Sequence, residues 1–322
     1  MGVKEEVLRA LRETEGYLSG QALADGLSVS RHAVWKAIDK LRHEGYQIEA
    51  ITNKGYRLTQ AEDTLSAEGV ASFLAPALPF RLEYHDTIDS TNNCARELAE
   101  AGAPEWTVVL AGNQSAGRGR MGRAFYSPEA SGIYMSVVVR PDCDVREANM
   151  LTLAAAAAVA EGVEAVCGQN VGIKWVNDCF INGRKFVGIL TEAAVGVEEQ
   201  SLRYAVVGIG INVSPPAGGY PAELADIVTS IYESPVQGEV RNRLAAEVLR
   251  RFHDYAAELT ARRYMASYRA HLFVIGREVR LVRGKDSETV RVLDLADDGA
   301  LIVQGADGRT RRVASGEVSL RF

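Results

Sequence analysis

The centre of the chain carries the stretch Gly117-Arg118-Gly119-Arg120-Met121-Gly122-Arg123, which packs three glycines and three arginines into seven residues. An apolar run ends before it at Ala111 and another begins after it at Ile133. Glycine lets a backbone approach a ligand closely, and arginine offers a planar fork of donors that suits carboxylate or phosphate. This composition indicates a loop that wraps an anion, although Arg-Gly segments also occur as solvated loops or nucleic-acid tails.

The bulk composition is that of a globular protein. The chain has 322 residues, is 47% hydrophobic and 24% charged, and has a formal net charge of −6. This length suffices for two or three domains, and the mild acidity leaves room for one small DNA-binding face. The four cysteines form no CxxC pair, as expected for free thiols in a reducing compartment. No run approaches ~18 consecutive apolar residues, so we expect a cytoplasmic protein without a membrane segment.

The first 62 residues are predicted to form a winged helix-turn-helix. Apolar spacing from Val3 to Leu11 predicts one helix, a second fits residues 20–25, and a third follows the turn at 26–29. Two β-like runs, 46–48 and 56–58, are joined through the turn sequence Asn53-Lys54-Gly55. In this order of elements the third helix enters the major groove. The candidate DNA contacts are Ser30, its N-cap, and Arg31, His32 and Lys36. The alternative is a small helical domain with a solvated basic face, because basic residues barely outnumber acidic ones here.

The rest of the chain is predicted to form two further domains. Residues 59–63 are polar and break the periodicity, so the first boundary is placed between 62 and 63. Strand-like runs at 84–88, 107–111, 133–139, 171–175, 185–192 and 204–211 alternate with helical segments at 91–101, capped by Ser90, and at 148–167. This predicts a central mixed α/β domain, residues 63–273, with helices on one face of about six strands. Amphipathic helices are expected between 238 and 268. Four short strands from 279 to 313 predict a small SH3-like β-barrel at 274–322, so the fold class is α+β and multidomain.

Three further clusters carry chemical groups at the ends or on the faces of strands. They are Lys174-Trp175-Val176-Asn177-Asp178, Lys185-Phe186-Val187-Gly188-Ile189-Leu190 and Gly208-Ile209-Gly210-Ile211-Asn212. The first sets a cation, an amide and a carboxylate at a strand end, and the third has two glycines on one face, where a flat ligand could lie. Taken singly, each cluster is better explained by a hairpin turn, an exposed edge lysine or a bulge, so the argument rests on their joint occurrence. The chain has no GxSxG or HExxH motif, and Val213 stands where a dinucleotide fingerprint needs its third glycine.

Together with Ser90-Thr91-Asn92 and Gln114, these clusters and the glycine-arginine loop resemble the biotin protein ligases, in the order of that family and over essentially the whole chain. With the N-terminal domain, the chain looks like the ligases that also repress the biotin operon. Two positions depart from the family pattern: Val176 stands where proline is usual, and Phe125 where a tryptophan near adenine is often found.

The resemblance implies an ATP-dependent ligase. The biotin carboxylate would displace pyrophosphate from ATP to give biotinyl-5′-AMP, with Mg²⁺ escorting the ATP phosphates. A lysine of the biotin carboxyl carrier domain of a carboxylase would then displace AMP. Positioning and electrostatic stabilisation suffice for both steps, so no enzyme nucleophile is required. The adenylate would order the loop and favour a homodimer that binds operator DNA and represses biotin-synthesis genes.

The resemblance also implies roles for individual residues. The catalytic residues would be Lys185, Arg118, Arg120 and Asp178, with Asp178 orienting the incoming amine. Biotin would be bound by Ser90, Thr91, Asn92, Gln114, Gly117, Arg118, Gly119, Arg120, Lys185, Gly188, Ile189, Leu190, Gly208 and Gly210. The nucleotide would be bound by Arg118, Arg120, Arg123, Phe125, Lys174, Trp175, Asn177 and Asn212. No metal site with protein-only ligands is implied.

Three alternatives share parts of this pattern. A lipoate ligase would use the same adenylation chemistry. A ligand-sensing transcription factor could keep the pocket and lose catalysis, but the intact loop and Lys185 argue against that. A biotin ligase could also have lost DNA binding in its N-terminal domain.

Overall fold

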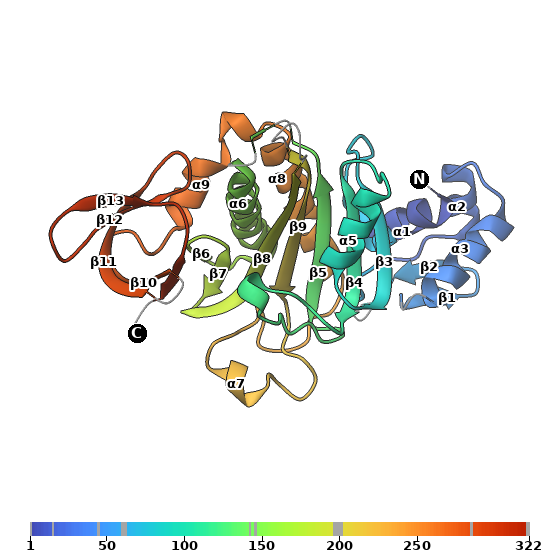
Figure 1. The fold of residues 1–322 in the computed structure, drawn as a ribbon. Coiled ribbons are helices and arrows are strands. Elements are labelled where there is room, and N and C mark those ends of the chain that lie inside the picture. The colour runs from blue at the N-terminus through green and yellow to red at the C-terminus, as the bar shows by residue number, and fades with distance from the viewer. Residues whose placement is uncertain are drawn as a thin grey trace.

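The computed structural model describes residues 2–14, 16–43, 46–58, 63–141, 143–144, 147–195, 202–283 and 286–319. Figure 1 shows a small helical unit at the N-terminal end, a large central sheet, and a small sheet at the C-terminal end. Residues 59–62, where the first domain boundary is predicted, lie outside the described residues. The boundaries at 62/63 and 273/274 therefore stay predictions.

The N-terminal unit has the predicted order of elements. They are α1 (Val3–Glu13), α2 (Gly20–Gly26), α3 (Arg31–His43), β1 (Ile48–Ile51) and β2 (Gly55–Leu58). Ser30 caps α3, because its Oγ accepts the amide proton of Ala33 at 3.1 Å. The apolar stripe of α3 is buried in a core that this unit has to itself. The first strand begins at Ile48 and not at Tyr46, since the Tyr46 amide donates to the Leu41 carbonyl and closes the end of α3.

The central sheet has seven strands in the order β3-β4-β5-β9-β8-β7-β6. Their bounds are β3 Arg81–Ile88, β4 Thr107–Gln114, β5 Gly132–Val139, β6 Gly172–Lys174, β7 Asp178–Ile181, β8 Arg184–Val195 and β9 Leu202–Asn212. Among the described ladders between these seven strands, the pair β3 and β4 is parallel and the others are antiparallel. The short strand β7 was not predicted.

Helices cover both faces of this sheet, so the expectation of one covered face is wrong. On one face, Val109 and Val138 pack in a core with Ala95 of α5 (Thr91–Glu100). The alternate residues, such as Val108, belong to a second core with α6 (Ala148–Cys167) and α8 (Val240–Ala256). This division follows from the two-residue period of a strand.

Helix α6 is the centre of the larger core. Its alanine run is buried, and a side chain at Gly162 would lie 2.9 Å from the Val248 side chain of α8. The small residues therefore permit close helix packing, as predicted. Within the described ranges, α6 is the one helix long and apolar enough to cross a membrane, but 72% of its apolar window is buried inside the protein.

The C-terminal unit is a five-stranded antiparallel sheet in the order β13-β12-β11-β10-β14. Its strands are β10 (Glu278–Arg283), β11 (Asp286–Leu295), β12 (Leu301–Gln304), β13 (Thr310–Val313) and β14 (Glu317–Ser319). The small β domain expected here is confirmed, with β14 as an unpredicted strand. Its apolar residues continue the core of the central unit, to which α9 (Tyr264–His271) leads.

The N-terminal unit is tied to the central unit by charged contacts. Lys4 lies 2.8 Å from Glu68 of α4 (Ala67–Ala71), and Arg12 contacts Ser72 and Glu239. Burial lowers the pKa of Arg12 to about 10. Since Glu239 directly precedes α8, the N-terminal unit meets the central unit at the start of that helix.

Candidate functional site

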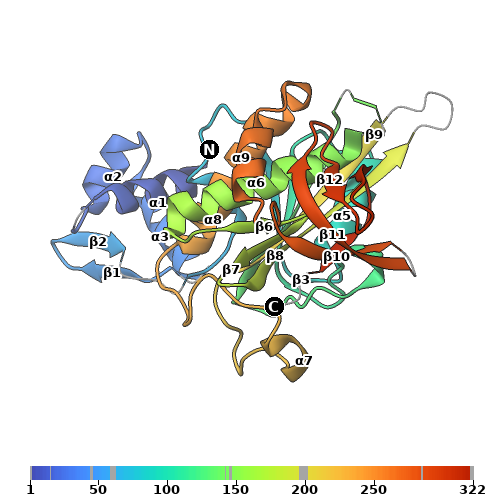
Figure 2. The same ribbon diagram turned by 90° about the vertical axis from the view of Figure 1, so that its left-hand side faces the viewer.

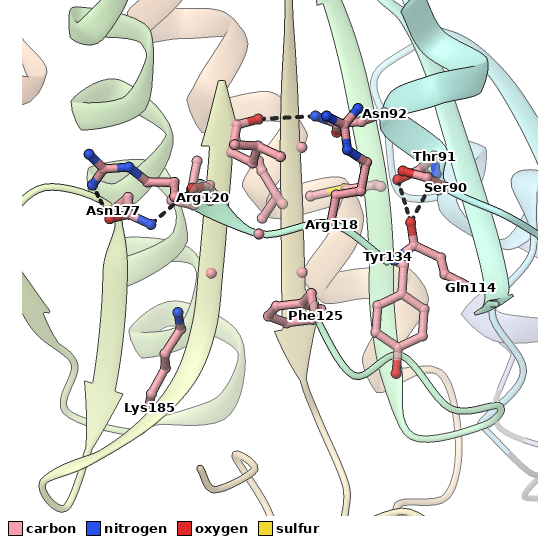
Figure 3. A pocket seen from close by; sticks show the side chains of 18 residues that line it. Ser90, Thr91, Asn92, Gln114, Arg118, Arg120, Phe125, Tyr134, Asn177 and Lys185 are labelled. Atoms are coloured by element: carbon pink, nitrogen blue, oxygen red, sulfur yellow. Dashed lines mark hydrogen bonds between the residues drawn. The ribbon is translucent and has the colours of Figure 1, made fainter. Parts of the chain in front are cut away.

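The predicted site residues surround a cavity of about 50 Å³ above the strands β5, β8 and β9 (Figure 3). Every residue predicted to bind biotin lines it except Gly117. Tyr134, Met135 and Ile209 also line it and were not predicted. The strand glycines, the first turn of α5 and the glycine-arginine loop thus form one site, although they are far apart in the sequence.

Glycines form the floor of this cavity. Gly188 lies opposite Gly210 in the ladder of β8 and β9, and Gly208 lies opposite Leu190. A side chain at Gly210 would come within 2.5 Å of the Phe125 ring, and one at Gly188 within 3.0 Å. The Phe125 ring therefore rests on bare backbone at Gly188 and Gly210, whereas the Asn92 side chain lies against Gly208, the other glycine at which a flat ligand was expected.

The glycine-arginine loop folds as a small hairpin. The Gly119 amide donates to the Arg123 carbonyl at 2.7 Å, and the Phe125 amide donates to the Gly117 carbonyl at 2.9 Å. The turn is made by Met121 and Gly122, which have φ angles of 57° and 74°. A side chain at Gly117 would collide with the Phe125 carbonyl. Gly117 therefore serves the closure of the hairpin, and the biotin contact predicted for it is absent from the cavity lining.

The polar end of the cavity is built around Gln114. Its Oε1 accepts the Thr91 amide proton at 2.9 Å, and its Nε2 donates to Ser127 Oγ at 2.8 Å. Ser90 occupies the N-cap position of α5, but its side chain makes no capping bond. The Gln114 side chain caps the helix in its place, so the side-chain amide of Gln114 fixes both the start of α5 and the wall of the cavity. Ser90 is buried and lines the cavity.

Two arginines of the loop, Arg118 and Arg120, line the cavity and are held by partners from different segments. Arg120 Nη1 donates to Asn177 Oδ1 at 2.9 Å, as Figure 3 shows. Arg118 donates to Asn93 Oδ1 at 2.9 Å and lies 3.1 Å from Glu192 on β8. A neutral amide is a weaker partner for guanidinium than an anion is. Arg120 is therefore free to turn to an anionic ligand, whereas Arg118 already holds the carboxylate of Glu192, which was not predicted.

Lysines gather at the other end of the cavity. Lys185 Nζ lies 2.6 Å from Asp178 Oδ1, and Lys174 Nζ lies 3.7 Å from the other oxygen of that carboxylate. Burial lowers the pKa of Lys174, against the attraction of Asp178. The cluster of two cations and one anion has a net positive charge, which suits an anionic group such as a carboxylate or a phosphate.

A second cavity, of about 330 Å³, adjoins the first and shares Phe125 and Lys185 with it. Its lining includes the predicted nucleotide residues Arg123, Lys174 and Asn212, and also Asp178. Its size is within the range of small-molecule pockets, roughly 300–1,000 Å³. Two adjoining cavities with a shared lysine can hold two ligands whose reacting ends meet at that lysine.

The wall of the second cavity comes from a segment to which the sequence assigned no role, residues 214–232. It contains α7 (Ala222–Ala225) and protrudes from the central unit in Figures 1 and 2. Its return is paired to β8, since the Lys185 amide donates to the Ile227 carbonyl at 3.0 Å and the Thr229 amide to the Lys185 carbonyl at 2.8 Å. Tyr220, Leu224, Ile227 and Val228 line the cavity.

Trp175 does not line either cavity. Its side chain is buried, and its Nε1 donates to the Gly299 carbonyl of the C-terminal unit at 2.9 Å. This position leaves the indole no face for a base, so the predicted nucleotide contact is replaced by a structural role. The peptide bond that follows it, Trp175-Val176, is cis.

The predicted DNA-contact residues lie together on the exposed start of α3. Arg31, His32 and Lys36 are exposed, and Ser30 precedes them as the cap. The ring of His32 stacks on Trp35, which is 52% exposed and was not among the predicted contacts. An exposed helix with two cations and two rings, beside a hairpin, has the composition of a groove-binding surface.

Comparison with known proteins agrees with each of these units. A sequence model described as the Biotin/lipoate A/B protein ligase family matches residues 84–212, an HTH domain matches 3–57, and a Biotin protein ligase C terminal domain matches 274–321. The chain is 38% identical to the "Bifunctional ligase/repressor BirA" of Bacillus spizizenii over 94% of both chains. It is 30% identical to the protein of that name from Escherichia coli, over 98% of this chain and 96% of that one.

A solved structure supports the same relationship. The biotin protein ligase from Aquifex aeolicus in complex with biotin and ATP superposes with a TM-score of 0.61 and 27% identity, over 75% of this chain and 98% of that one. The fold, the two cavities and the relatives that match along almost the whole chain agree. The protein therefore belongs to the biotin protein ligase family, on the branch of the bifunctional ligase/repressors.

Proposed function

We propose that this protein is an ATP-dependent biotin protein ligase that also represses transcription of biotin-synthesis genes. It forms biotinyl-5′-AMP and transfers biotin to a lysine of the biotin carboxyl carrier domain of a carboxylase. The observation that carries the proposal is the pair of adjoining cavities that share Lys185 and Phe125. One cavity has a polar end and a glycine floor, which suit biotin, and the other is larger and cationic, which suits a nucleotide.

In the first cavity, the ureido ring of biotin would lie at Ser90, Thr91, Asn92 and Gln114. The rest of the molecule would lie along Gly188, Gly208 and Gly210, beside Gly119, Ile189 and Leu190. Its carboxylate would point to Lys185, with Arg118 and Arg120 closing over it. This orientation is supported by Figure 3, in which Lys185 and Arg120 lie on the opposite side of the cavity from Thr91 and Gln114.

The first step is an in-line displacement at phosphorus. A carboxylate oxygen of biotin attacks the α-phosphorus of ATP, an acyl phosphate bond forms, and the bond to pyrophosphate breaks. Lys185 and the two arginines would stabilise the negative charge that develops on the phosphoryl oxygens. The nucleotide would be held in the second cavity by Arg123, Lys174 and Asn212. Asn177 would contact it from the lining of the first cavity, and Phe125 would lie between the two ligands.

The second step is an acyl transfer. The neutral ε-amine of the acceptor lysine attacks the carbonyl carbon of the adenylate, an amide forms, AMP leaves, and the amine loses a proton. Asp178 would orient that amine, and its position between two lysines supports a role at the reacting end. Asp178 is also the one carboxylate among the described residues that line the cavities. We therefore expect Mg²⁺ to be held by ATP phosphates and water more than by the protein.

The N-terminal unit would bind operator DNA through Ser30, Arg31, His32 and Lys36. We infer that the protein acts as a homodimer, because two helix-turn-helix units related by a two-fold axis match a two-fold operator. Binding of the adenylate, and not of biotin alone, would favour that dimer. The four cysteines all lie within the described ranges and form no disulfide with one another, which supports a place in the cytoplasm.

Incorporation of labelled biotin into a carboxyl carrier domain tests the ligase. We expect labelling that requires ATP, with lipoate giving none; labelling by lipoate alone would establish the lipoate-type alternative. A gel shift with the biotin-operon region, with and without biotin plus ATP, tests the repressor. Equal operator affinity in both conditions would contradict the proposed coupling, and no affinity in either would leave a ligase without DNA binding.

A further inference from the structure

Glu192 on β8 contacts two residues of the biotin cavity from behind. Its Oε1 lies 3.1 Å from Arg118 Nη2, and its Oε2 accepts a proton from Asn92 Nδ2 at 2.8 Å. Its side chain is 27% exposed, so the carboxylate is partly shielded from water. Glu192 does not line the cavity itself, and any effect on a ligand must therefore pass through these two partners.

The contact with Asn92 fixes the direction of a chain of hydrogen bonds. With Nδ2 turned to Glu192, Asn92 Oδ1 faces Ser136 Oγ at 2.7 Å. Ser136 is completely buried. A carbonyl oxygen can only accept, so the single hydroxyl proton of Ser136 is donated to Asn92. Ser136 Oγ then turns a lone pair to Thr91 Oγ1, which lies 2.8 Å away.

Thr91 therefore faces the cavity as an acceptor. Its one hydroxyl proton goes to Ser136 or to Gln114 Oε1, which is 3.1 Å from Thr91 Oγ1, and both lie within the protein. A lone pair of Thr91 is left for the ligand. If the Asn92 amide were reversed, Ser136 would accept from Asn92 and donate to Thr91. Ser136 would then no longer take the Thr91 proton, and Thr91 could donate that proton to the ligand in place of accepting one.

We propose that Glu192 is a positioning residue for biotin: it fixes the Asn92 amide and, through Ser136, makes Thr91 an acceptor for a ureido N–H. The same carboxylate holds Arg118, so the loop and the polar end of the cavity are locked to one group. This inference rests on the proposed function, because it explains how that site selects a cyclic urea, which carries two N–H donors.

Titration calorimetry of the full-length protein with biotin, without ATP, tests this role. Glu192→Ala and Ser136→Ala should each weaken biotin binding about two- to tenfold, as expected for losing one hydrogen bond between neutral groups. Glu192→Gln should recover most of the affinity, because its carbonyl oxygen can still accept from Asn92. The control is Glu100→Gln on α5, whose carboxylate accepts from Tyr204 at 3.1 Å away from the site; it should bind biotin normally.

A double-mutant cycle provides the decisive comparison. If Glu192 acts through Thr91, the variant Thr91→Val with Glu192→Ala should bind biotin little worse than the weaker single variant. If the losses of affinity in the two single variants multiply in the double variant, the proposal is overturned. It is also overturned if Glu192→Gln binds biotin as weakly as Glu192→Ala, since only the ion pair with Arg118 would then matter. If Glu192→Ala does not fold, the biotin affinity of Ser136→Ala tests the proposal in its place. Unchanged affinity in Ser136→Ala would show that the hydrogen bonds through Ser136 do not affect biotin binding, and would overturn the proposal.

The same measurements separate this inference from the proposed function. Wild-type protein that makes no biotinyl-5′-AMP from biotin and ATP would contradict the proposed function itself. Active wild-type protein whose Glu192→Ala variant binds biotin normally would contradict only the role of Glu192.

Discussion

Replacing Lys185 with alanine should stop adenylate formation and leave biotin binding largely intact. Lys185 Nζ faces both cavities and lies 2.6 Å from Asp178. It is thus placed where the biotin carboxylate and the α-phosphate would meet. The ureido end and the glycine floor, on which most biotin contacts depend, do not involve its side chain.

The expected size of the effect follows from the charges. Two unit charges about 4 Å apart, at an effective dielectric constant of about 20, interact by about 4 kcal/mol. Loss of one preorganised donor in an oxyanion site lowers kcat by about 10²–10³. In Lys185→Ala, Asp178 would also lose its nearer cation and repel the phosphate. We therefore expect kcat for adenylation to fall about a thousandfold, and the Kd for biotin to rise less than tenfold.

Single-turnover release of pyrophosphate measures the first quantity and titration calorimetry measures the second. Lys174→Ala is the matched control, because Lys174 Nζ lies farther from the same carboxylate, at 3.7 Å. Its effect on kcat should be smaller. Retained pyrophosphate release in Lys185→Ala would refute the assigned role, and so would a loss of biotin binding as large as the loss of kcat.

Three further predictions concern other parts of the chain. The double variant Arg31→Ala, Lys36→Ala should weaken operator binding and reduce the slope of log affinity against log salt concentration by about 2, since each lost phosphate contact contributes about 0.9. Unchanged salt dependence in a filter-binding assay would contradict the assignment of α3 as the helix that contacts DNA. Gly210→Ala should raise the Kd for biotin at least about tenfold with little change in Tm, because the new methyl group enters the cavity floor; normal affinity would contradict the assigned floor. A hydrogen bond from Arg250 lowers the pKa of Glu247 from 4.5. Its stabilisation is complete above that value and disappears as pH falls through the lowered folded pKa, so Glu247→Gln should lower Tm at pH 7 and match wild type in acid, as thermal unfolding scans can check.

The sequence predicted best those elements whose pattern is long or strongly punctuated. Helix α6 begins and ends where its alanine-rich run does, and Ser30 caps α3 as expected. The strands β7 and β14 were missed because each has at most four residues, too few to show a two-residue period, and β14 also pairs with the distant strand β10. The second covered face of the sheet was missed as well, since the central strand β5 is buried on both faces and shows no alternation.

The sequence predicted those site residues that belong to recognisable motifs. It did not predict the residues that reach the site only through contacts between distant segments. The loop and the strand glycines meet as expected, because the ladder sets Gly188 opposite Gly210. Glu192 and Ser136 have no sequence signal, since their partners lie at least 44 residues away along the chain. Residues 214–232 show no periodicity, and their position depends on pairing with Lys185. Trp175 stands inside a chemical motif, yet its burial is decided by the C-terminal sheet.

The position of the Phe125 ring on the glycine floor affects the heat-capacity change of biotin binding. Its edge already covers Gly188 and Gly210, so biotin must displace the ring before it can lie along the same backbone. Binding then replaces the contact of the Phe125 ring with the backbone by a contact of biotin with the same backbone. The apolar surface removed from water on binding is therefore smaller than the apolar surface of biotin alone. Because the heat-capacity change reports that surface, biotin binding should show a small negative ΔCp. Phe125→Ala, with its floor exposed beforehand, should show a larger one.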